Sequence, residues 1–163
     1  MKIVYGNDII IYISKQYVEK NNLNEGKNIK KFINILKNKY NLELYGYYEI
    51  KIYIDENYGI IMKLIKNELE YLDYLNNELE ININIIEDSF LYQIEDLWLL
   101  KKIKDNIVIY KCFEKIYIEI NKISNIFLPS IIENSTIIFG EQAVKIKDKS
   151  LIINPEVIKW KNQ

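Results

Sequence analysis

Three pairs of short apolar segments, each joined by a tight turn, most constrain how this chain can fold. KIVY and IIIYI flank residues 6–8, whose Gly, Asn and Asp tolerate the positive φ of a tight turn. EIKIYID and IIMKLIK flank residues 56–59, and NIVIYK and KIYIEIN lie around Phe113-Glu114. Alternating apolar and polar residues are typical of half-buried strands, and strands joined so closely pair antiparallel. The sequence therefore predicts β-hairpins and argues against parallel βαβ units.

Amphipathic helices accompany these hairpins. Apolar residues recur at helical spacing from 27 to 40, with lysines and asparagines on the opposite side; they are Ile29, Phe32, Ile33, Leu36 and Tyr40. Glu95 and Asp96 open a second predicted helix, which ends in lysines, and this order of charges suits the helix dipole. Asn154-Pro155-Glu156 predicts a helix start near the end of the chain.

These elements predict an α+β fold of antiparallel hairpins and amphipathic helices in two similar-sized halves. Residues 1–66 are expected to form a hairpin, a helix and a hairpin, and residues 89–163 a C-terminal α+β unit. Residues 67–88 are assigned to an acidic connecting segment, in which 67–80 lack a fixed period and ININII alternates again.

The strand pattern also predicts which side chains face the core. The alternating isoleucines are expected to point inward: Ile50, Ile52, Ile54, Ile116, Ile118 and Ile120. Lys51, Lys115 and Glu119 are expected to point outward. Cys112 lies in a predicted strand and is expected to be a small core residue.

The chain lacks the residues on which most catalytic sites depend. It has no histidine and no arginine, so Ser-His-Asp and Cys-His sites, histidine-bearing metal sites and arginine clamps are excluded. Its five glycines form neither a dinucleotide-binding nor a P-loop pattern. The carboxylate pairs Glu78/Glu80, Glu87/Asp88 and Glu95/Asp96 lack calcium-loop spacing. We therefore expect no enzyme, cofactor or metal site, and a carboxylate-using enzyme is the less favoured alternative.

Charge and apolar patterning bear on partners and on location. The net charge is −1, whereas proteins that neutralise phosphates usually carry a basic excess, so nucleic acid is not favoured. Lysines 27, 30, 31, 37 and 39 form one basic cluster, either a solvated helix face or a contact surface. No apolar run approaches the ~20 residues that a bilayer requires, and the N-terminus lacks the apolar region of a secretory signal. We expect a cytoplasmic protein without membrane partners.

The residue usage is skewed towards isoleucine, lysine, asparagine and tyrosine. These residues have AT-rich codons, which indicates an AT-rich genome. The fourteen tyrosines and two tryptophans have two interpretations: codon bias with strand propensity, or interface aromatics.

The order of elements resembles the MecA family of adaptor proteins, which deliver substrates to a Clp-type AAA+ chaperone. The opening MKI…NDIIIYIS…YVE is similar to the start of that family, and GYYEIKIYI…YGIIMKLIK to the hairpin of its N-terminal domain. FLYQIEDLWLLKK, IYKCFEKIYIEI, SIIENSTIIF and DKSLIINPEVIKW resemble successive parts of its C-terminal domain. This resemblance implies that residues 89–163 dock a chaperone and that residues 1–66 hold a client.

The expected function is thus a non-enzymatic protein-binding adaptor or regulator. Its candidate contact residues are Glu95, Asp96, Trp98 and Lys101, because an aromatic anchor with flanking charges of both signs suits an interface. The alternative at this position is that Trp98 packs in the core. The alternative function is a small interaction or inhibitor protein, borne by a phage or plasmid of an AT-rich bacterium.

Overall fold

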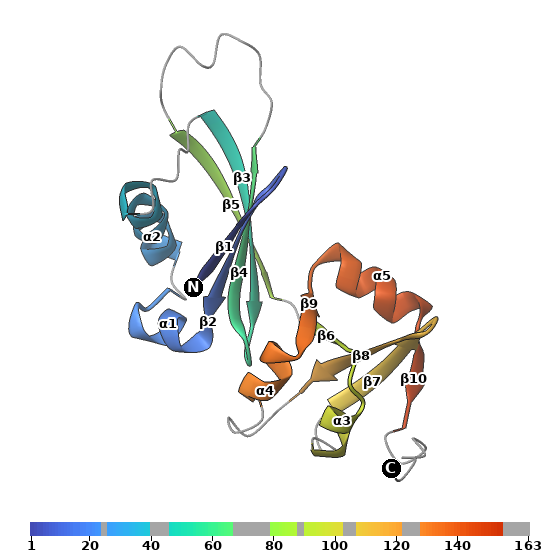
Figure 1. The fold of residues 1–163 in the computed structure, drawn as a ribbon. Helices are drawn as coiled ribbons and strands as arrows, with labels where there is room; N and C mark the ends of the chain where they lie inside the picture. Colours follow the sequence, from blue (N-terminus) through green and yellow to red (C-terminus); the bar gives the residue numbers. More distant parts are fainter. Residues whose placement is uncertain are drawn as a thin grey trace. The chain divides into compact units, whose positions relative to one another are not determined.

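The computed structural model describes residues 1–23, 26–39, 46–66, 79–87, 90–102, 107–121 and 128–154 (Figure 1). The chain divides into two compact units, Met1–Glu87 and Asp88–Gln163. The described residues form a five-stranded sheet in each unit and five helices in all, which confirms the predicted α+β class. None of these helices is long and apolar enough to cross a membrane.

The first sheet has the strand order β1-β2-β4-β3-β5. Its strands are β1 (Lys2–Tyr5), β2 (Ile9–Ser14), β3 (Gly46–Asp55), β4 (Gly59–Lys66) and β5 (Leu79–Glu87). The predicted hairpins β1–β2 and β3–β4 are confirmed, and β2 pairs antiparallel with β4. One cross-strand row runs through Lys2, Tyr12, Ile61, Tyr53 and Ile86, so the start of β1 and the end of β5 lie at one end of the sheet.

Strand β5 departs from the purely antiparallel pattern that the sequence predicts. It pairs in parallel with β3, from Gly46 opposite Leu79 to Ile54 opposite Glu87. Residues 79–87, which the sequence pattern assigns to the connecting segment, thus belong to the first sheet, and residues 67–78 lie outside the described residues. Because the partners are distant in sequence, no local turn signal marks this pairing.

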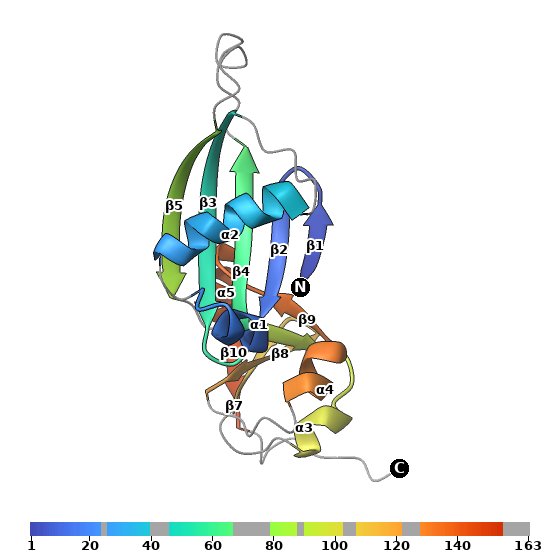
Figure 2. The same ribbon diagram turned by 90° about the vertical axis from the view of Figure 1, so that its left-hand side faces the viewer.

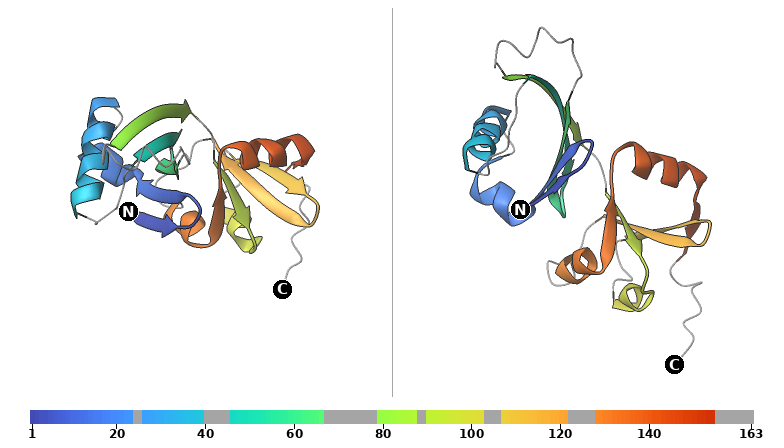
Figure 3. Two further views of the ribbon diagram at one scale, coloured as in Figure 1. Left: turned by 90° about the horizontal axis from the view of Figure 1, so that it is seen from above. Right: turned by 45° about the horizontal axis from the view of Figure 1, so that its top comes forward.

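Helix α2 (Gly26–Lys39) covers one face of the first sheet, as Figure 2 and both views of Figure 3 show. Its predicted apolar stripe of Ile29, Phe32, Ile33 and Leu36 is buried, which confirms the helical spacing. The stripe packs in one core with Ile11, Ile13, Ile50, Ile52, Ile60, Met62 and Leu64 from the strands. Tyr40 lies outside the described residues. The short helix α1 (Lys15–Lys20) precedes α2, and Ser14 makes no side-chain cap to it.

The second sheet is antiparallel, in the order β10-β7-β8-β6-β9. Its strands are β6 (Leu91–Ile94), β7 (Ile107–Cys112), β8 (Lys115–Ile120), β9 (Ser135–Ile138) and β10 (Leu151–Ile153). The predicted β7–β8 hairpin is confirmed, with Phe113 at φ 55° in its turn. Helices α3 (Trp98–Lys102), α4 (Leu128–Glu133) and α5 (Glu141–Lys149) complete the described part of this unit. The helix predicted at Asn154-Pro155-Glu156 lies outside the described residues.

The predicted strand register holds for most positions. Ile50, Ile52, Ile118 and Ile120 are buried, while Ile54 and Ile116 are half-buried. Lys115 is exposed as expected, and Cys112 is buried.

Glu119 corrects the predicted register at one point, because its side chain is only 14% exposed. Helix α5 packs on this side of the sheet, where Ala143 is buried with Leu91, Cys112 and Tyr117. Glu119 Oε1 accepts a hydrogen bond from Lys147 Nζ on α5 at 2.8 Å, and Glu119 Oε2 accepts one from Tyr110 at 2.8 Å. The prediction that Glu119 points to solvent is therefore wrong, since a helix far along the chain covers it.

Candidate protein-binding site

The β6–α3 corner, formed by Glu95, Asp96, Leu97 and Trp98, contains three of the four predicted contact residues. Asp96 Oδ1 accepts a hydrogen bond from the Trp98 backbone N–H at 2.9 Å, and the Asp96 carbonyl accepts one from Leu99 at 3.3 Å. Asp96 therefore acts as the N-terminal cap of α3. The sequence predicts that Glu95 and Asp96 open the helix. In the structure both acids precede α3, and its first turn contains no acid.

Helix α3 separates buried and exposed side chains over a single turn. Leu99 and Leu100 are buried, whereas Trp98 is 53% exposed and Leu97 is 42% exposed. Trp98 thus does not pack wholly in the core. The Asp96 cap holds the backbone at the start of α3, and about half of the surface of Trp98 is accessible there. The side chain of Lys101 lies outside the described set.

A polar hollow of about 370 Å³ adjoins this corner. Its lining comes from the end of β6, the end of α4 and the start of β9: Gln93, Glu95, Asp96, Glu133, Asn134, Ser135 and Thr136. The pairing of Gln93 with Thr136 and of Ile94 with Ser135 brings these elements together. Glu133 thereby joins Glu95 and Asp96, although sequence reasoning does not single it out. No local pattern could indicate it, because β6 and β9 are far apart in sequence.

Charges of both signs surround the hollow. Glu95, Asp96 and Glu133 are exposed carboxylates. Lys115, also exposed, lies within 3.4 Å of Gln93, measured from Nζ to Oε1, and brings a positive charge to the same place. Among the described residues, no three acidic or cysteine side chains are grouped so that they could hold a metal ion.

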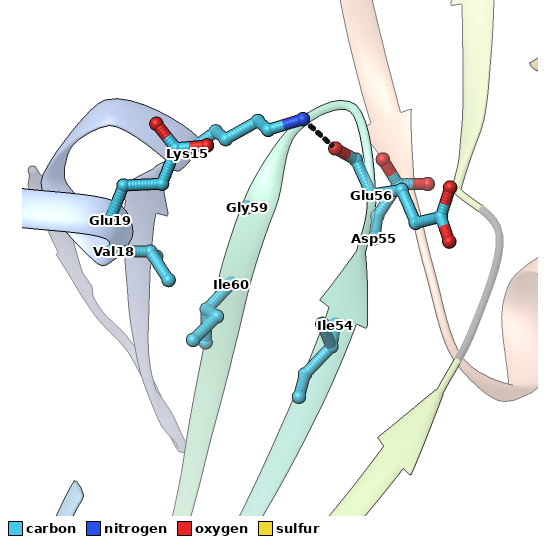
Figure 4. A pocket seen from close by; sticks show the side chains of 8 residues that line it. All are labelled: Lys15, Val18, Glu19, Ile54, Asp55, Glu56, Gly59 and Ile60. Carbon is cyan, nitrogen blue, oxygen red and sulfur yellow. Dashed lines mark hydrogen bonds between the residues drawn. The ribbon is translucent and has the colours of Figure 1, made fainter. Parts of the chain in front are cut away.

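A second hollow, of about 440 Å³, lies in the first unit where α1 meets the β3–β4 turn (Figure 4). Val18, Ile54 and Ile60 line its apolar side, and Lys15 reaches across to the turn (Figure 4). Lys15 Nζ donates to the Glu56 carbonyl at 2.8 Å, and the Lys15 backbone N–H donates to the Tyr58 carbonyl at 2.7 Å. These bonds join the helix to the turn.

The buried acid of this second hollow also serves the turn. Asp55 is 6% exposed, and its Oδ1 accepts hydrogen bonds from the backbone N–H groups of Asn57 and Tyr58, each at 2.8 Å. Burial, with a smaller contribution from Tyr12, raises the pKa of Tyr58 to about 12. Lys15 and Asp55 of this hollow thus hold the hairpin turn in shape, and we assign these two residues to the fold.

No protein-family model, curated protein or solved structure matches this chain.

Proposed function

We propose that this protein is a non-enzymatic adaptor that binds a protein partner through the β6–α3 corner of its second unit. The observation that carries the proposal is the half-exposed Trp98, placed on a capped helix beside a hollow with charges of both signs. Tryptophan is among the residues most enriched at binding hot spots. Surrounding charges speed association and select partners more than they add affinity.

The partner that we propose is the N-terminal domain of a Clp-type AAA+ chaperone. Support comes from the similarity of FLYQIEDLWLLKK to the part of the MecA family that opens its chaperone-docking domain. The same resemblance supports a role for the first unit in holding a client protein. Two separate compact units suit an adaptor, because each can offer its own surface to a different partner.

The proposal is tested by calorimetric titration of the full chain with the N-terminal domain of a Clp-type chaperone from the same host. Wild-type protein should release or absorb heat on binding. Trp98→Ala should weaken binding by about 2 kcal/mol or more, or roughly 30-fold, as expected for an aromatic hot spot. Tyr5→Ala is the matched control, because Tyr5 is an exposed aromatic residue of the first unit.

Charge variants test the rim of the same site. Glu95→Lys and Glu133→Lys should each slow association and change its dependence on salt. Asp96 should be replaced by Asn, which removes the charge but keeps an oxygen that can accept the Trp98 N–H bond. Circular dichroism then verifies that α3 and the fold are retained.

Two results would end this proposal. One is the absence of binding heat with every Clp-type chaperone of the host, which would leave a small interaction or inhibitor protein as the alternative. The other is an equal loss of affinity in Trp98→Ala and Tyr5→Ala, which would place the effect outside the corner.

A further inference from the structure

Helix α2 concentrates positive charge in a unit that is otherwise acidic. Its sequence, GKNIKKFINILKNK, contains five lysines and no carboxylate. Residues 1–87 together contain 11 lysines and 13 carboxylates. Five of the 11 lysines of the first unit thus lie on one helix that has no carboxylate, so the local field there differs in sign from that of the unit as a whole.

The lysines share the outer side of α2 with an exposed apolar residue. Lys30 and Lys31 are exposed, and Ile35 is 49% exposed. Lys31 and Ile35 are four residues apart, so they are neighbours on successive turns. The sequence continues this spacing with lysine at positions 27 and 39. We call Lys30, Lys31 and Ile35 the outer face of α2.

Lys30, Lys31 and Lys37 differ from three lysines outside α2 in their ion pairs. Within the described part of the chain, no ion pair joins Lys30, Lys31 or Lys37 to a carboxylate, whereas Lys51, Lys63 and Lys147 each have one. Removing the outer lysines should therefore leave the core intact, because the opposite side of the helix holds the buried stripe.

We propose that the outer face of α2 binds an acidic protein segment that carries an apolar side chain. The lysines match glutamates and aspartates in charge, and Ile35 offers an apolar contact between them. Nucleic acid fits less well, because the chain has no arginine for phosphate contacts and because Ile35 has no counterpart on a phosphate backbone. This inference rests on the proposed function, because the outer face of α2 would be the surface with which the adaptor holds its client.

The length of the helix defines a suitable probe. Its 14 residues span about 21 Å at ~1.5 Å per residue. An extended peptide of about six residues has the same length. The probe is therefore a fluorescein-labelled peptide of about eight residues, with glutamates on both sides of a central leucine. Its binding to the full chain is measured by fluorescence anisotropy at low salt and should weaken as salt is added.

Two variants test the outer face. Lys30→Glu combined with Lys31→Glu should weaken peptide binding by about 5- to 30-fold, because two attractive contacts become repulsive. Ile35→Ala should weaken it about threefold, because part of an apolar contact is lost. The matched control combines Lys2→Glu with Lys20→Glu, which changes the net charge equally at exposed positions outside α2. The control should retain wild-type affinity, and all variants should keep the circular dichroism of the wild type.

Three results would overturn the inference. They are no binding of the acidic peptide at low salt, an equal loss in the control variant, and tighter binding of a single-stranded oligonucleotide of equal charge through Lys30 and Lys31. Trp98→Ala should leave peptide binding unchanged. Failure of the chaperone titration and failure of the α2 surface are therefore separate results.

Discussion

Gly59 occupies the point where the β3–β4 turn lies against the start of α1. Its φ is +123°, and a Cβ placed there would lie 2.5 Å from the Ile13 carbonyl oxygen and 2.6 Å from the Lys15 nitrogen. Both neighbours are backbone atoms, so they cannot turn aside as a side chain can. We expect Gly59→Ala to lower the free energy of unfolding by at least about 2 kcal/mol, measured by urea denaturation.

Gly6→Ala is the control for this substitution. Its added Cβ would lie 3.6 Å from the Asp8 carbonyl oxygen, which is an ordinary contact. It should change the free energy of unfolding by less than about 1 kcal/mol. Similar losses in the two variants would show that the cost comes from the general loss of glycine and not from the contacts at Gly59.

The ionisation of Tyr110 should lower the free energy of unfolding of the second unit at alkaline pH. Burial, the hydrogen bond to Glu119 and the charge of Glu119 together raise its pKa from 10.0 to about 12. The folded state thus favours the protonated phenol. The resulting stability is complete below pH 10 and is lost as the pH rises towards 12.

We therefore expect the free energy of unfolding of the wild type to fall more steeply over this range than that of Tyr110→Phe. Glu119→Gln should bring the pKa of Tyr110 closer to 10 and make the fall shallower. Denaturant titrations at a series of alkaline pH values measure the free energy of unfolding of all three proteins. Equal slopes in the three proteins would contradict the role assigned to Tyr110.

At the scale of the element, α2 allows a test with two isoleucines of the same helix. Ile33 is fully buried, whereas Ile35 is half exposed. Ile33→Ala should cost about 2–5 kcal/mol, since it leaves a cavity in the core. Ile35→Ala should change the free energy of unfolding by less than about 0.5 kcal/mol. Urea denaturation of both variants measures the difference, and comparable costs would contradict the orientation of the helix.

Elements that depend on near neighbours in sequence are the ones that the sequence predicts well. The hairpins and the buried stripe of α2 follow from turns and spacings only a few residues long. The parallel pairing of β3 with β5 and the pairing of β6 with β9 depend on distant partners. Glu119 is mispredicted and Glu133 is missed, because elements distant in sequence determine what surrounds each of them.

At the scale of the whole molecule, the end of the first unit at Glu87 leads to a prediction about fragments. The core of this unit is made of its own residues, and Ile81 and Ile83 of β5 pack against it. A fragment of residues 1–87 should therefore unfold cooperatively in urea. A fragment of residues 1–66 lacks β5, so it exposes the edge of β3 and should be less stable or should aggregate.

Size-exclusion chromatography and circular dichroism compare the two fragments. Equal stability of both fragments would show that β5 contributes little to the first unit, and would favour a boundary at residue 66. An unfolded 1–87 fragment would show that the first unit depends on the rest of the chain.

The cross-strand row from Lys2 to Ile86 has a mechanical consequence. The chain enters the first sheet at one edge and leaves it at the other edge, but it does so at the same end. A force applied between these two points would peel β1 and β5 away from their neighbours and break their hydrogen bonds one after another. Sheets loaded in this way yield at lower force than sheets whose strands must slide past each other. The first unit should therefore open at low force when it is pulled through its two ends, which single-molecule force spectroscopy would measure.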